Sequence, residues 1–394
     1  MDANLQQLFE QARNASRRLL CLSGEDRNRV LLRVADAIEQ NEQNILTANE
    51  KDLARMDKDN PMYDRLQLTS ARIRGIASDM RHVVQLPSPL GIITKQTTLA
   101  NGIRLHRVSV PYGVIGVVYE ARPNVTYDVF SLCFKSGNVC VLKGGKDAAD
   151  SNMYAVEIIQ SVLREEHIDE HCITLMPTSH DATQAILTAV GYVDLCIPRG
   201  SRRLIDFVRD NARVPVIETG AGVVHTYFDK DGDLEKGKRI INNAKTRRVS
   251  VCNALDCLLV HKDRKKDLDQ LLQPMKDRVQ FHYDNYGLEW QSYDLSIKIV
   301  ESLDEAISFI QQHSSGHSES IITENETAAR RFQKEIDAAC VYWNVPTSFT
   351  DGAQFGLGAE IGISTQKLGP RGPMGLEEIT TYKWIIEGEG QIRE

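Results

Sequence analysis

The alternation of short β-branched runs with longer helical stretches between residues 111 and 218 constrains the fold most strongly. Runs at 114–118, 139–142, 173–176, 195–197 and 214–217 predict strands. Stretches with helical periodicity separate them, at 125–135, 153–164, 182–190 and 204–210. This alternation favours a parallel, doubly wound α/β sheet. Such sheets bind ligands beyond the carboxyl ends of their strands, so the residues after each run become candidates for a site.

The flanking regions have regular patterns of their own. Residues 5–84 predict several helices, in which Leu31, Val34, Ile38 and Ile45 are spaced for one buried stripe. The region after residue 218 predicts a second α/β domain, with helices at 234–245, 268–278, 303–312 and 328–336 and strands at 258–261, 297–300, 319–322 and 340–343. No Gly/Ser-rich linker separates the two regions.

Residues 92–110 carry a separate signal, because Ile103 and Leu105 alternate with polar neighbours. Asn101-Gly102 interrupts the alternation, and this dipeptide favours a hairpin turn with positive φ at both positions. We therefore expect an antiparallel hairpin.

Composition excludes several classes of protein. The 394 residues suffice for two or three domains, and the net charge of −7 comes without a long basic run, which argues against nucleic-acid binding. The N-terminal stretch lacks the apolar core of a signal peptide and no segment approaches 18 apolar residues, so we expect a cytoplasmic protein that does not bind membranes. Eight cysteines occur without a CxxC pair, so neither a disulfide framework nor a metal site is expected.

One of these cysteines, Cys252, stands in an unusual segment, NAKTRRVSVCNA at 243–254. A thiolate is a nucleophile, and Lys245, Arg247 and Arg248 are neighbours of the kind that lower a cysteine pKa. The alternative is that Cys252 is a small buried hydrophobic residue.

Polar residues follow the predicted strands of the first domain, at Asn124, Lys143 and Gly200-Ser201. Lys143 precedes Gly144-Gly145, which lets a phosphate approach the backbone, and Ser201 could cap a helix whose N-terminus faces a pyrophosphate. Neither G-x-G-x-x-G nor a P-loop is present, so ordinary turns remain the alternative.

Five blocks together show a family resemblance. They are the cysteine segment, EARPNVT at 120–126, LKGG at 142–145, PVIETG at 215–220 and FGLGAEIGISTQKLGPRGPMGL at 355–376. In this wording the chain resembles the aldehyde dehydrogenase superfamily over essentially its whole length. The resemblance implies an α/β aldehyde dehydrogenase-like fold with a doubly wound cofactor-binding domain (1–94 and 111–220), an α/β catalytic domain (221–382) and a small β oligomerisation arm (95–110 and 383–394). It also implies a homo-oligomer.

The same resemblance implies roles for individual residues. Cys252 would be the nucleophile, and Asn124 with the backbone N–H of Cys252 would stabilise the oxyanion. Glu360 would hold the nicotinamide ribose, while Lys143 would contact the adenosine ribose and the 2′-phosphate of NADP. Gly200 and Ser201 complete the expected cofactor contacts.

The fuller wording of the blocks resembles members that reduce an acyl phosphate, L-glutamyl 5-phosphate, to L-glutamate 5-semialdehyde with NADPH. For this substrate the resemblance implies contacts from Arg122, Ser318, Thr347 and Arg371. Which arginine binds the phosphate and which the α-carboxylate stays open, and so does a partnership with glutamate 5-kinase. The wording departs from the family at Val249, where proline is usual, and at 368–370, where His-Ala usually precedes the arginine.

Glu218 keeps two alternatives open. In hydrolytic superfamily members the matching glutamate activates water, which favours a hydrolytic NAD(P)-dependent aldehyde dehydrogenase. In a reductase Glu218 would instead be structural or cofactor-related. A non-catalytic binding or regulatory protein on the same scaffold is a third possibility, against which Cys252, Asn124 and Glu360 argue together.

Overall fold

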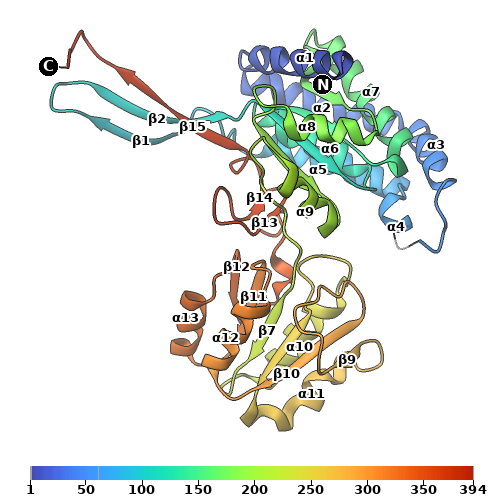
Figure 1. Cartoon of the computed structure of the whole chain (residues 1–394), viewed down its shortest axis with the longest axis vertical. Helices are drawn as coiled ribbons and strands as arrows, with labels where there is room; N and C mark the ends of the chain where they lie inside the picture. Colours follow the sequence, from blue (N-terminus) through green and yellow to red (C-terminus); the bar gives the residue numbers. More distant parts are fainter. Residues whose placement is uncertain (1, 61, 394) are drawn as a thin grey trace. The chain divides into compact units, whose positions relative to one another are not determined.

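The computed structural model describes residues 2–60 and 62–393, which divide into two compact units (Figure 1). Unit 1 comprises the described residues up to Ile217, Leu357–Gly362 and those from Met374 on. Unit 2 comprises Glu218–Gly356 and Ile363–Pro373.

Unit 1 begins with helices that pack through one apolar stripe. Leu31, Val34 and Ile38 are fully buried and Ile45 is 2 % exposed, so the predicted stripe is confirmed. Ser23 and Asp26 form a capping box that starts the second helix. The helices are α1 (Ala3–Leu19), α2 (Gly24–Gln40), α3 (Glu42–Leu53), α4 (Tyr63–Leu66) and α5 (Ser70–Gln85).

The centre of unit 1 is a four-stranded parallel sheet in the order β5-β4-β3-β6. Its strands are β3 (Val114–Tyr119), β4 (Val139–Lys143), β5 (Ile173–Leu175) and β6 (Leu195–Arg199). The connecting segments contain α6 (Asn124–Lys135), η1 (Lys146–Ala148), α7 (Ala149–Glu165), η2 (Glu170–Cys172), α8 (His180–Thr188) and α9 (Arg202–Asn211). The strand order reverses at β3, which has β4 on one side and β6 on the other, so the crevice between β3 and β6 is the expected ligand position.

The predicted strand at 214–217 is wrong in extent. The segment makes only one parallel bridge, between Cys196 and Val216. Two backbone bonds accompany it, from the Cys196 N–H to the Pro215 carbonyl and from the Ile217 N–H to the Cys196 carbonyl. Pro215 has no N–H to extend the ladder, which limits the pairing.

Unit 2 contains a six-stranded parallel sheet in the order β12-β11-β7-β8-β10-β9. Alternate residues of its strands bury two apolar clusters, one with Phe228 and Leu258 and the other with Tyr227 and Leu259. The strands are β7 (His225–Phe228), β8 (Cys257–His261), β9 (Gln280–His282), β10 (Asp294–Val300), β11 (Ser318–Ile322) and β12 (Cys340–Trp343).

The helices of unit 2 supply the other half of these clusters. They are α10 (Leu234–Thr246), η3 (Lys262–Asp267), α11 (Leu268–Leu272), η4 (Gln273–Met275), α12 (Leu303–His313), α13 (Glu326–Glu335) and η5 (Thr347–Phe349). The helix predicted over 268–278 ends early as an α-helix, at Leu272, because Pro274 cannot donate the next backbone hydrogen bond. Short strands β13 (Gly362–Ser364) and β14 (Gly372–Met374) form a separate two-stranded sheet.

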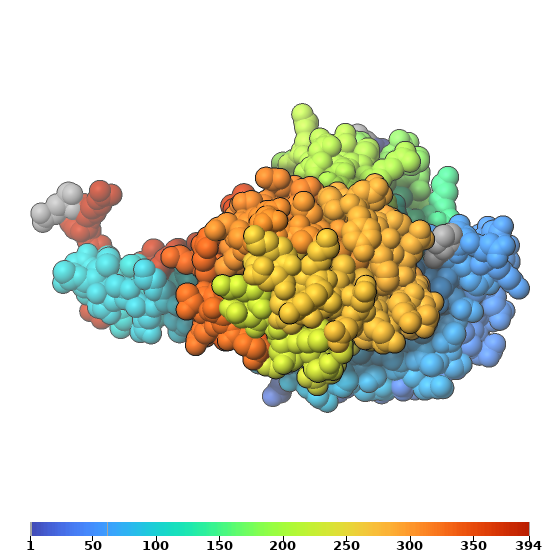
Figure 2. All heavy atoms as spheres, turned by 90° about the horizontal axis from the view of Figure 1, so that it is seen from below, coloured from blue at the N-terminus to red at the C-terminus, as the bar shows by residue number. Residues whose placement is uncertain are grey.

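A three-stranded antiparallel sheet of unit 1 extends away from the rest of that unit (Figure 1 and Figure 2). It consists of β1 (Ile93–Thr98), β2 (Arg104–Pro111) and β15 (Thr380–Glu387). The predicted hairpin is confirmed, but only Gly102 of its turn has a positive φ, because the Leu99 N–H bonds to the Ile103 carbonyl around a longer loop. Large apolar side chains of this sheet are exposed: Ile93, Tyr382, Trp384, Ile385 and Ile386.

Residues 357–362 and 374–382 belong to unit 1, whereas the expected catalytic domain included them. The Ile361 N–H bonds to the Met374 carbonyl at 2.9 Å, and the Asn138 amide donates to the Ile379 carbonyl at 2.8 Å. The functional division into cofactor-binding, catalytic and oligomerisation parts stays a prediction.

Candidate active site

Cys252 lies in unit 2, in the turn that connects α10 to β8, and is partly buried. Contacts on both sides fix this turn. The Asn253 amide donates to the Thr350 carbonyl at 2.9 Å, and the Lys245 ammonium donates to the Leu255 carbonyl at 2.9 Å. The backbone around the nucleophile candidate is therefore held from both flanks.

Lys245 differs from the two arginines that follow it. Its side chain is fully buried, whereas Arg247 and Arg248 are exposed. Burial lowers the pKa of Lys245 and raises the pKa of Asp256, and the opposite charge of each counteracts the effect on the other. The expected effect of Lys245 on the pKa of Cys252 stays a prediction, and the structure shows that Lys245 supports the loop.

Gly222 lies against the same loop. A Cβ atom on Gly222 would overlap the carbonyl oxygen of Cys252, so only glycine permits this approach. The Glu218 N–H donates to the Gln366 side chain at 2.8 Å, and Thr219 pairs with Ser364. The segment that begins at Glu218 therefore reaches the Cys252 loop at Gly222, within unit 2.

Cys252 differs from Cys257, the next cysteine in the sequence. Cys257 is 1 % exposed within β8, and burial raises the pKa of its thiol, with further effects from Glu319 and Asp256. A buried thiol of this kind is a poor nucleophile.

In unit 1, the carboxyl ends of β3 and β6 form a second polar cluster. The Ser201 N–H donates to the Glu120 carboxylate at 2.8 Å and the Ser201 hydroxyl does so at 3.3 Å. The same hydroxyl accepts the Leu204 N–H at 3.4 Å, which confirms that Ser201 caps α9. A Cβ on Gly200 would lie 2.5 Å from Glu120 Oε2, so a larger residue there would displace the Glu120 side chain.

Lys143 ends β4, the neighbour of β3 in the sheet, and is 9 % exposed. Burial lowers the pKa of its ammonium group, Lys146 lowers it further and Glu120 acts in the opposite direction. The expected cofactor residues Lys143 and Ser201 thus surround Glu120. Sequence reasoning gave Glu120 no role, although it stands in the EARPNVT block.

Asn124 begins α6, and its amide nitrogen donates to the Asp128 carboxylate at 2.9 Å, one turn later. Burial raises the pKa of Asp128 to about 7, while the hydrogen bond from Asn124 acts in the opposite direction. Asp79 and Glu360 raise this pKa further and Arg199 lowers it. Asp128 therefore orients the Asn124 amide, and Glu360 lies near the same group. The Asn-Asp spacing of one turn is the signal that could have revealed it.

The expected substrate residues have varied surroundings. Ser318 and Thr347 are fully buried: the Ser318 hydroxyl contacts Thr350 Oγ1 at 2.7 Å, and the Thr347 hydroxyl donates to the Asn253 carbonyl at 2.9 Å. Arg371 donates to the Asp337 carboxylate at 2.8 Å, and Arg122 is half-buried. Their roles toward a substrate stay predictions, but the contact of Thr347 makes it a support of the Cys252 loop.

Within the residues that the structure describes, no group of three or more His, Cys, Asp and Glu side chains could hold a metal ion. In the same part of the chain, no helix is long and apolar enough to span a membrane.

Comparison with known proteins identifies the class. The model of the aldehyde dehydrogenase family matches residues 2–282 and 295–385. The chain belongs to this family, and membership implies a nicotinamide cofactor.

Individual relatives within the family share one enzyme name. The chain is 56 % identical over its whole length to the whole of a gamma-glutamyl phosphate reductase from Bacteroides thetaiotaomicron. It is 54 % identical to the enzyme of that name from Chlorobium chlorochromatii, with 100 % of this chain and 99 % of the relative covered. A crystal structure of gamma-glutamyl phosphate reductase from Thermotoga maritima has a TM-score of 0.95 at 38 % identity and covers 99 % of this chain and 100 % of its own.

Gly222→Ala should reduce kcat by about 100-fold or more, because the new methyl group must displace the backbone of Cys252 and misplace the nucleophile. Steady-state kinetics and thermal unfolding would test this. Gly75→Ala is the matched control, since it adds the same methyl group in open space within α5 and should be neutral or slightly stabilising. A folded Gly222→Ala protein with full activity would contradict the expected contact.

His317, which contacts Ser318, should make the stability of the protein pH-dependent. Its pKa is lowered from 6.5 to about 4 by burial, so between these values the unfolded chain binds a proton that the folded chain does not. The contribution is fully present above pH 6.5 and is lost as the pH falls toward 4, by an amount on the order of 3 kcal/mol. Because glutamine does not titrate, the melting temperature of wild type should fall relative to that of His317→Gln as the pH drops through this window. Parallel pH profiles would show that His317 does not contribute.

Proposed function

We propose that this protein is an NADPH-dependent gamma-glutamyl phosphate reductase. It reduces L-glutamyl 5-phosphate to L-glutamate 5-semialdehyde and phosphate, the second step of proline biosynthesis from glutamate. Full-length similarity to enzymes of that name carries the proposal. A partly buried Cys252 on a fixed loop supports it.

The chemistry starts at Cys252. Its thiolate attacks the acyl carbon, a C–S bond forms, and the bond to the phosphate oxygen breaks with phosphate as the leaving group. When bound, a nicotinamide cofactor would supply the hydride for reduction of the resulting thioester. The thiohemiacetal then collapses: the C–S bond breaks with its electron pair on sulfur, the hydroxyl proton passes to this thiolate, and the aldehyde is released with the Cys252 thiol regenerated.

Each tetrahedral stage places negative charge on the former carbonyl oxygen. The Asn124 side chain and the Cys252 backbone N–H are the proposed donors to this oxygen. One amide hydrogen of Asn124 is directed to Asp128, which leaves the second for the oxyanion. Asp128 thereby positions Asn124 without contacting the substrate.

The cofactor-binding residues fit a phosphate-containing ligand. Ser201 presents an N–H and a hydroxyl at the start of α9, and Gly200 keeps the approach free of a side chain. Glu120 accepts hydrogen bonds from both Ser201 donors, so cofactor binding must replace the Glu120 carboxylate. Lys143 supplies the positive charge for the 2′-phosphate, and Glu360 binds the nicotinamide ribose.

Lys143→Ala should weaken NADPH binding by roughly 10- to 150-fold and NADH binding much less. The expected loss is that of one charge-assisted hydrogen bond to the 2′-phosphate, which NADH lacks. Fluorescence titration of both cofactors would measure the two dissociation constants, with NADH as the internal control. An equal loss for both cofactors would remove Lys143 from this role.

Phosphate dependence tests the reaction itself. In the reverse direction, oxidation of L-glutamate 5-semialdehyde with NADP⁺ should require inorganic phosphate or arsenate, because phosphate and not water cleaves the thioester. Cys252→Ala should abolish this activity, whereas Cys21→Ala, which alters an exposed cysteine, should retain it. Thermal unfolding would confirm that both variants fold.

Glu218 separates the reductase from a hydrolytic aldehyde dehydrogenase. Loss of a general base typically costs about 10²- to 10⁴-fold, but the reductase activates no water, so Glu218→Gln should keep a substantial fraction of the activity. Phosphate-independent oxidation to glutamate, lost in a folded Glu218→Gln variant, would establish the hydrolytic enzyme instead. If wild type showed no activity that Cys252→Ala abolishes, the protein would be a binding or regulatory member of the family.

We further propose a homo-oligomer in which the sheet of β1, β2 and β15 is an interface, because large apolar side chains on it are exposed. Glutamate 5-kinase, which makes the unstable acyl phosphate, is the proposed metabolic partner. A role in amino-acid biosynthesis supports a cytoplasmic location. Sedimentation of wild type and of a protein with Trp384→Lys would show whether this sheet holds the subunits together.

A further inference from the structure

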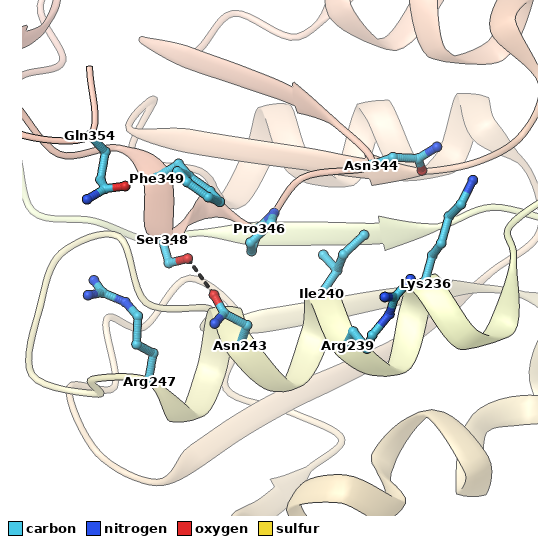
Figure 3. A pocket seen from close by; sticks show the side chains of 10 residues that line it. All are labelled: Lys236, Arg239, Ile240, Asn243, Arg247, Asn344, Pro346, Ser348, Phe349 and Gln354. Atoms are coloured by element: carbon cyan, nitrogen blue, oxygen red, sulfur yellow. Dashed lines mark hydrogen bonds between the residues drawn. The ribbon is translucent and has the colours of Figure 1, made fainter. Parts of the chain in front are cut away.

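A pocket of about 580 Å³ lies within unit 2, between α10 and the segment 344–354 (Figure 3). Ligand pockets commonly have volumes of about 300–1,000 Å³, so this one can hold a small metabolite. Its walls are formed by Lys236, Arg239, Ile240, Asn243, Arg247, Asn344, Pro346, Ser348, Phe349 and Gln354.

The pocket is positively charged. Three of its lining residues are cations and none is a carboxylate. Lys236 is neutralised by Glu324 at 2.8 Å, but Arg239 and Arg247 form no ion pair within the described part of the chain. Arg239 lies on α10 and Arg247 is its C-cap residue, about two turns later, and both side chains line the pocket (Figure 3). Uncompensated guanidinium groups in a concave site favour an anion.

The pocket wall is hydrogen-bonded to the Cys252 loop. The Ser348 hydroxyl donates to Asn243 Oδ1 at 2.7 Å, as the dashed line in Figure 3 marks. The Asn253 amide donates to the Ser348 carbonyl at 3.4 Å, and Asn253 directly follows Cys252. A ligand in the pocket would therefore lie beside the structure that positions the nucleophile.

The lining also contains apolar surface. Phe349 is 44 % exposed, and Ile240 and Pro346 border the same space. An inorganic anion would use only the cations and leave this surface uncovered. A carboxylate attached to a short aliphatic chain would use both kinds of surface.

We propose that this pocket binds the α-carboxylate end of the amino-acid substrate, with Arg239 and Arg247 as the carboxylate-binding residues. The inference rests on the proposed function and adds its specificity site. Arg239 and Arg247 take the place of Ser318 and Thr347, whose hydroxyls are buried in contacts within the protein. Because no carboxylate lines the pocket, the α-ammonium group contributes less to recognition than the α-carboxylate.

Three five-carbon aldehydes test the proposal: L-glutamate 5-semialdehyde, 5-oxopentanoate, which lacks the amino group, and pentanal, which lacks both groups. Their NADP⁺- and phosphate-dependent oxidation is measured for wild type, the two single Arg→Gln variants and the double variant. For both carboxylate-bearing aldehydes, kcat/KM should fall by about 10- to 100-fold in the double variant, mainly through KM. Oxidation of pentanal, which carries no carboxylate, should fall much less, so the preference for carboxylate-bearing aldehydes should shrink.

Lys238→Gln is the matched control, because it removes a cation from the same helix outside the pocket and should leave all three substrates unaffected. Both arginines are exposed, so the variants should fold, and melting temperatures with NADP⁺ affinity verify this. If wild-type oxidation requires phosphate but the arginine variants still prefer the carboxylate-bearing aldehydes over pentanal as strongly as wild type does, the pocket assignment is wrong. The proposed function would then still stand. A wild type without phosphate-dependent oxidation would overturn the proposed function and this inference with it.

Discussion

The Cys252 loop depends on one hydrogen bond, which a buried ammonium group donates. Lys245 is fully buried at the end of α10 and donates to the Leu255 carbonyl beyond the loop. An isolated buried charge is costly, and here the nearby carboxylates of Asp256 and Asp294 favour the charged form. Asp256 in turn accepts backbone N–H groups of Val224 and Trp290. The same group of charges therefore connects the cysteine loop to the start of β7 and to the segment before β10.

Two further segments of unit 2 support the Cys252 loop. Asn253 bonds to the segment that follows β12, and Gly222 approaches Cys252 from the segment before β7. Because β7, β8, β11 and β12 belong to one parallel sheet, these supports share a rigid base. Loops carry function when a rigid scaffold positions them, and this loop is held on several sides.

Sequence patterns predicted the two α/β regions, the buried stripe at Leu31 and the hairpin, because these depend on periodicity and turn chemistry. They did not predict that Lys245 is buried, since a lysine near two arginines normally indicates a solvated face. Its acceptor is a main-chain carbonyl, which no side-chain pattern reveals. The strand His225–Phe228 was not predicted, although its β-branched and aromatic residues carried the signal. The contact between Glu120 and Ser201 joins two distant segments and depends on the pairing of β3 with β6.

The two proposed anion-binding regions use different chemistry, and this difference follows from the anion proposed for each. In unit 1, main-chain and hydroxyl donors at a helix N-terminus suit the tetrahedral oxygens of a phosphate, and Glu120 occupies them with a carboxylate of the same protein. In unit 2, guanidinium groups on a helix face suit a planar carboxylate, and no acidic residue of the pocket neutralises Arg239 or Arg247. The hydrogen-bond donors of Ser201 are already occupied by the Glu120 carboxylate. A weakly binding anion must compete with this carboxylate, which is tethered in the same protein, and therefore binds poorly. Small anions are therefore disfavoured in unit 1, while a cofactor with many additional contacts can still displace Glu120.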